Sequence, residues 1–125
     1  MRLPPLSVLL TRFALAFCFL GFGVWELIQP RMWITYVPTS LASVMNPSTL
    51  VLTHGIALTV TGLGILSGWM PKLFTGLATL IMLEICVEIF LQEGFTDIFI
   101  RDVSILLFTS AMFAKAWSSS KSAAA

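Results

Sequence analysis

The sequence predicts an all-α membrane protein, a bundle of four transmembrane helices with an interfacial segment between helices 1 and 2. Of its 125 residues, 58% are hydrophobic and only 10% are charged, whereas a soluble domain carries roughly 25% charged residues. A spanning helix needs ~20 apolar residues, and four apolar runs of that order follow one another along the chain. We expect one transmembrane domain at residues 1–117. Residues 118–125 are expected to be a disordered tail or an artificial addition.

The first helix is expected from about Pro5 to Ile28, where Pro30 ends it. Proline suits a helix start, because the first N–H groups have no partner inside the helix. The apolar run is too long for the hydrophobic region of a signal peptide, and no A-x-A site follows it. We therefore interpret it as a retained helix. Gly21 and Gly23 would let a neighbouring helix approach closely.

Residues 30–45 are too short and too interrupted by proline to span a membrane. Trp33 and Tyr36 are the residue types that anchor proteins at the membrane interface. We interpret this stretch as an interfacial or partly re-entrant segment, in which the two aromatic residues form a lid over one end of the bundle.

Three further helices are expected at about 47–67, 71–92 and 97–117. Asn46 is a suitable N-cap for the first of them, followed by proline at the first helical position. Gly68 and Gly94 are suitable stops, because glycine adopts the backbone conformation that ends a helix.

The basic residues predict the orientation, because cytoplasmic segments of membrane proteins carry an excess of Lys and Arg. The side with both termini holds Arg2, Arg12, Lys72, Lys115 and Lys121, and the other side holds Arg31 and Arg101. We therefore expect an integral cell-membrane protein with both termini in the cytoplasm. The lipid bilayer is its first partner, and its glycine-rich helix faces allow oligomers. No basic run indicates nucleic-acid binding.

Six ionisable residues fall at similar depths in the outer half of the four helices, as judged from the 1.5 Å rise per residue. They are Glu26, His54, Glu84, Glu88, Arg101 and Asp102. Ionisable groups in hydrocarbon are costly and mark a functional-site hypothesis. Glu84 and Glu88 lie one helical turn apart, and Arg101 is the expected cation for the carboxylates, because guanidinium binds them bidentately.

Four interpretations of this cluster remain open. It is a structural ion-pair network, a polar pocket for a small ligand or quinone-like head group, a metal site, or a proton or ion path through the two glutamates. The metal candidates are His54, Glu84 and Glu88. They are weak, because the Glu-x-x-His pair of helical metal sites is missing, and no metal is expected. Arg12 either extends to the interface or faces inward toward an anionic group.

The chain also resembles a known family. The resemblance rests on Arg12, Phe19, Gly23, Glu26, Pro30, Trp33 and the pair Arg101-Asp102. Over most of residues 6–117 the chain is similar to the DoxX family of small bacterial and archaeal membrane proteins. The resemblance implies a four-helix fold and relatives that include thiosulfate:quinone oxidoreductase subunits and partners of thiol-redox enzymes. The residues shared with the motif are Arg12, Gly23, Glu26, Arg101 and Asp102.

Our leading hypothesis is an integral membrane accessory or scaffold subunit of a redox or thiol-stress system. Its outward-facing polar pocket would engage a quinone-like ligand or a membrane or extracytoplasmic redox protein. One alternative is a small-molecule or proton-coupled transporter that uses Glu84 and Glu88. Another is a membrane oxidoreductase that depends on a metal or a quinone. We expect no enzymatic activity of the chain alone, and no catalytic residue is identified.

Overall fold

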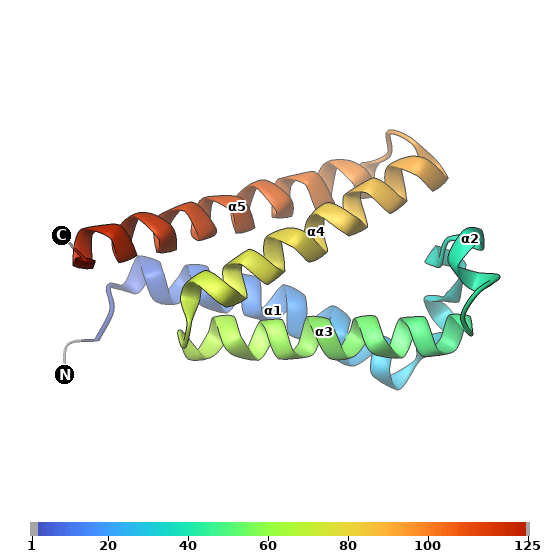
Figure 1. The fold of residues 1–125 in the computed structure, drawn as a ribbon, viewed down its shortest axis with the longest axis horizontal. Coiled ribbons are helices and arrows are strands. Elements are labelled where there is room, and N and C mark those ends of the chain that lie inside the picture. Colours follow the sequence, from blue (N-terminus) through green and yellow to red (C-terminus); the bar gives the residue numbers. More distant parts are fainter. Residues whose placement is uncertain (1–2, 125) are drawn as a thin grey trace.

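The computed structural model describes residues 3–124 and is helical throughout, with no strand in that range. Its long helices are α1 (Leu6–Ile28), α3 (Pro47–Ser67), α4 (Pro71–Glu93) and α5 (Asp97–Ala124). Between α1 and α3 lie the short helices η1 (Pro30–Met32), η2 (Ile34–Tyr36) and α2 (Thr39–Ala42). The long helices run along one common direction, α3 packing against α1 and α4, and α4 against α5 (Figure 1).

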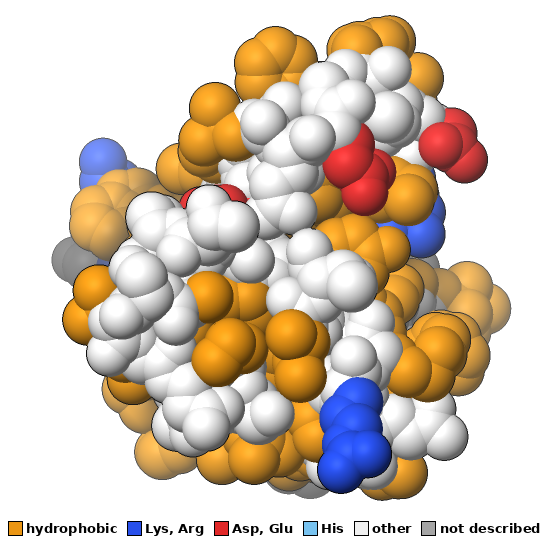
Figure 2. Space-filling model, turned by 90° about the vertical axis from the view of Figure 1, so that its right-hand side faces the viewer, with side chains coloured by type: hydrophobic (Ala, Val, Ile, Leu, Met, Phe, Trp, Pro, Cys, Tyr) orange, Lys and Arg blue, Asp and Glu red, His pale blue; other side chains and the backbone are white. Residues whose placement is uncertain are grey.

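The two ends of the molecule differ in what they carry. α1 begins and α5 ends at the same end, which we call the terminal end (Figure 1). The opposite end carries η1, η2 and α2, together residues 30–42, which we call the lid segment. Figure 2 looks onto this lid end and shows mostly hydrophobic and uncharged surface, with a few acidic side chains in the upper half of the view and a basic side chain in the lower half.

Three helices, α1, α3 and α4, are each long and apolar enough to cross a membrane. α5 is longer but more polar, because it includes four charged residues before its serine-rich end. Large apolar side chains point outward along the helices, such as Phe17 at 82% exposure and Leu80 at 65%. Soluble monomers rarely expose contiguous apolar surface on this scale. The outer surface is that of a membrane protein.

Close contact between α1 and α3 depends on small residues. A methyl group added at Gly23 would lie 2.6 Å from Thr59 Oγ1 and 3.0 Å from the Gly55 carbonyl oxygen. A methyl group at Gly55 would lie 3.1 Å from Glu26 Cβ. The predicted role of Gly23 is thus confirmed, whereas that of Gly21 is wrong, because nothing lies within 4 Å of its added methyl.

The expected helix ends match the structure for α3, which spans Pro47–Ser67. The Asn46 side chain accepts a hydrogen bond from the Ser48 N–H at 2.9 Å, and Gly68 takes the left-handed conformation at the other end. The last helix differs. It was expected to end near Trp117, but α5 continues to Ala124, so residues 118–124 are helical rather than a disordered tail. Residue 125 lies outside the described residues.

Candidate ligand pocket at the lid end

A pocket of about 600 Å³ opens among the four long helices beneath the lid segment. Its wall includes all eight residues that the sequence assigned to the polar cluster and the lid: Glu26, Trp33, Tyr36, His54, Glu84, Glu88, Arg101 and Asp102. Apolar side chains such as Phe19, Leu58 and Met82 supply much of the remaining wall. A largely apolar cavity with a few convergent polar groups is the usual form of a small-molecule site.

The glycine contact explains why a carboxylate from α1 meets the imidazole of α3. His54 is the residue before Gly55, and Glu26 is one helical turn after Gly23. Because the two glycines bring the backbones together, the side chains beside them meet across the helix pair. Glu26 is consequently 5% exposed, in a region where a lone carboxylate would be strongly destabilising.

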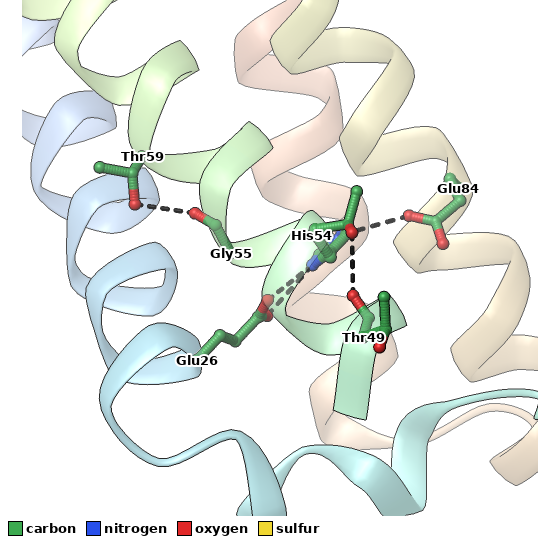
Figure 3. A network of polar contacts seen from close by, with 7 residues as sticks. Glu26, Thr49, His54, Gly55, Thr59 and Glu84 are labelled. Carbon is green, nitrogen blue, oxygen red and sulfur yellow. Dashed lines mark hydrogen bonds and ion pairs between the residues drawn. The ribbon is translucent and has the colours of Figure 1, made fainter. Parts of the chain in front are cut away.

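His54 lies between two carboxylates from different helices (Figure 3). Its Nδ1 is 2.9 Å from Glu26 Oε2 and 3.2 Å from Oε1. On the other side, the buried Nε2 lies 3.4 Å from Glu84 Oε2, an ion pair when the ring is protonated, although the contact is too long or poorly aligned for a hydrogen bond. An ionised carboxylate only accepts, so Nδ1–H donates to Glu26, and Nε2 is the ring nitrogen that faces Glu84.

This arrangement fixes what the histidine can do. In the neutral ring Nε2 carries a lone pair and can accept a hydroxyl proton; in the imidazolium form Nε2–H can donate to a carbonyl oxygen or to the Glu84 carboxylate. Glu26 stabilises the second form and holds the ring orientation in both. Glu26 and Glu84 face opposite ring nitrogens of His54, so the three side chains do not converge on one point. Among residues 3–124 no group of three or more His, Cys, Asp or Glu is arranged to hold a metal ion.

Arg101 has a different partner from the one expected. Its Nε donates to Asp102 Oδ1 at 2.9 Å, and the guanidinium lies 5.7 Å from the centroid of the Phe22 ring. No ion pair within the described chain joins it to Glu84 or Glu88. The expected single network around Arg101 is therefore two separate ones. The physical reason is that the neighbouring Asp102 carboxylate is buried at 6% exposure and takes the nearest donor.

The lid segment is held by aromatic packing and one hydrogen bond. Trp33 packs edge-on against Phe22 and Trp25, at centroid distances of 5.7 and 5.3 Å, and against Tyr36 at 5.8 Å. The Gln92 side chain donates to the Tyr36 carbonyl at 2.9 Å and so ties the lid segment to α4. The Trp33 indole Nε1 is buried with no hydrogen-bond partner. Trp33 is one of the residues that line the pocket.

Several pocket residues were not anticipated from the sequence, namely Cys18, Phe22, Trp25 and Gln92. Helical spacing contained the signal for some of them. Phe22 precedes Glu26 by one helical turn and Gln92 follows Glu88 by one turn, so each lies on the same face as its glutamate. Extending each predicted polar position along its helix face would have found Phe22 and Gln92.

Comparison of the chain with protein-family models, with curated proteins and with solved structures gives no match.

Proposed function

We propose that this protein binds a small amphipathic ligand with a carbonyl- or hydroxyl-bearing head group, of the quinone class, in the pocket beneath the lid segment. The single observation that carries the proposal is the buried indole nitrogen of Trp33, a residue of this apolar pocket, which has no hydrogen-bond partner. His54 Nε2, in another residue of the pocket, has only the 3.4 Å ion pair with Glu84. Buried polar groups are nearly always hydrogen-bonded. A ligand oxygen would satisfy the Trp33 N–H and could also bind His54 Nε2 in place of Glu84.

Trp33 and His54 would recognise different oxygen groups of the ligand. Trp33 Nε1–H only donates, so it suits a carbonyl oxygen. His54 Nε2 either accepts from a hydroxyl or donates to a carbonyl, so it suits both the reduced and the oxidised form of such a head group. The apolar wall and the aromatic rings of Phe22 and Tyr36 would pack against the ring and its apolar chain. The residues of the pocket would thus bind and orient the ligand, and His54 would exchange a proton with its head group.

In the cell we place this pocket in an integral membrane accessory or scaffold subunit of a redox or thiol-stress system. This assignment rests on the resemblance to the DoxX family. All four long helices, α5 included, would span the membrane, with both termini in the cytoplasm and the lid end outside. The distribution of Lys and Arg supports this orientation. Proton-coupled transport is the second candidate, favoured by the row of Glu26, His54 and Glu84 across three helices.

Binding of a short-chain quinone to the purified protein in detergent, measured by calorimetry, tests the proposal. Trp33→Phe keeps the ring but removes the donor, and we expect affinity to fall about five- to tenfold, the effect of roughly one hydrogen bond. His54→Phe should weaken binding at least as much. The matched control Trp69→Phe changes an exposed indole that does not line this pocket. Absence of binding to the wild type, or equal affinity of all variants, would refute the proposal.

A further inference from the structure

A second pocket, of about 700 Å³, lies at the terminal end between α1, the start of α4 and α5. Three cations from these three helices line it, Arg12, Lys72 and Lys115, and no carboxylate belongs to its described wall. The hydroxyl residues Thr11, Thr75, Ser119 and Ser120 also line it. We call it the basic pocket.

The Arg12 guanidinium is partly buried and packs on the turn that ends α3. A methyl group added at Gly68 would lie 2.6 Å from Arg12 Nη1 and 2.8 Å from its Cζ. Gly68 has a φ of 72°, so only glycine serves both the turn and the close approach of the guanidinium. Among residues 3–124 the Arg12 side chain has no ion pair and no side-chain hydrogen bond. Its five N–H donors remain available.

Lys72 lies in the first turn of α4, where the helix dipole disfavours a positive charge. That helix end has no side-chain cap, since Met70 occupies the N-cap position. The Lys72 ammonium lies 4.4 Å from the centroid of the Trp117 ring, which fixes its position beside α5. An anion in the basic pocket would offset the unfavourable position of the Lys72 charge at this helix end. It would also bind the three cations at the same time.

We propose that the basic pocket binds a phosphoryl group, carried by an anionic lipid or present as free phosphate. Guanidinium and ammonium groups are the usual phosphate partners, the former in a bidentate manner. Apolar side chains beside the cations, Val8, Leu73 and Met112, give the wall a surface on which an acyl chain packs. The site is separate from the pocket at the lid end, where the carboxylates gather.

Thermal unfolding of the full chain in mild detergent tests the proposal. Three additions are compared at equal ionic strength: phosphatidylglycerol, phosphatidylcholine and inorganic phosphate. We expect phosphatidylglycerol to raise Tm by about 5 °C at saturation, and phosphatidylcholine to have no such effect. Arg12→Gln and Lys115→Gln should each weaken the apparent affinity about tenfold or more. Arg31→Gln, an exposed arginine of η1 at the lid end, is the matched control and should behave as the wild type.

Stabilisation by phosphatidylglycerol alone, lost in the two pocket variants, supports the site and identifies a lipid. Stabilisation by inorganic phosphate with the same loss supports the site and identifies the free anion. Equal responses to both lipids with none to phosphate, or an Arg31→Gln loss as large as that of Arg12→Gln, would overturn the proposal. If Arg12→Gln fails to fold, Lys115→Gln decides the test, because Lys115 is exposed.

Discussion

The contact between α1 and α3 yields a sharp test, because two glycines of one helix have opposite surroundings. In Gly23→Ala the new methyl would lie 2.6 Å from Thr59 Oγ1, 2.8 Å from Thr59 N and 3.0 Å from Gly55 O. Two of these three atoms are backbone atoms of α3, so rotation of one side chain cannot relieve the clash. The helices must move apart, and the Glu26–His54 contact must lengthen with them.

Gly21→Ala is the matched control, because its methyl would have no neighbour within 4 Å. Both changes replace glycine by alanine inside α1, and the intrinsic gain in helix propensity, up to about 1 kcal/mol, is common to both. Overpacking a tight contact costs about 1–3 kcal/mol. Gly21→Ala should therefore be neutral or slightly stabilising. Gly23→Ala should be less stable than Gly21→Ala by about 1–3 kcal/mol, because the propensity gain cancels in this difference.

Reversible unfolding in mixed micelles with an increasing fraction of SDS, followed by circular dichroism, measures the two free energies of unfolding. Quinone affinity of the same samples reports on the pocket, and only Gly23→Ala should weaken it. If the two variants agree within about 0.5 kcal/mol, the ordinary scatter of surface substitutions, the close contact of α1 with α3 at Gly23 is refuted.

The same SDS titration checks the expected effects of four further substitutions. Glu26→Ala should lower the free energy of unfolding by about 1–3 kcal/mol, since it removes the acceptor from a buried N–H. Glu84→Ala should cost under about 1 kcal/mol, because that side chain is 55% exposed; equal costs would contradict this ranking. Arg101→Ala should cost about 1–3 kcal/mol by leaving the buried Asp102 carboxylate without its donor, and adding Asp102→Asn should recover part of the loss; no recovery would argue against the pair. Asn46→Ala should cost about 0.5–2 kcal/mol through the lost N-cap, and an unchanged midpoint would show that the cap contributes nothing.

Much of the helical layout could be predicted, because helix ends are set by local chemistry. Asn46 and Gly68 bound α3 through hydrogen bonds and backbone angles that depend only on neighbouring residues. The end of α5 could not be placed this way, since the serines and alanines after Trp117 tolerate helix and coil alike. The residues of the candidate pocket were found by depth, a one-dimensional quantity. Depth could not predict which of these side chains pair with each other, because it does not fix the rotation of one helix against another.

The sequence by itself determined an all-helical chain with membrane-like apolar surfaces and a band of ionisable groups toward one end. Those properties follow from composition, periodicity and spacing along the chain. Only the tertiary structure decided that His54, rather than Arg101, meets the carboxylates of Glu26 and Glu84. The reason is geometric: the close approach at Gly23 and Gly55 sets the rotation of α1 against α3, and that rotation decides which side chains face each other.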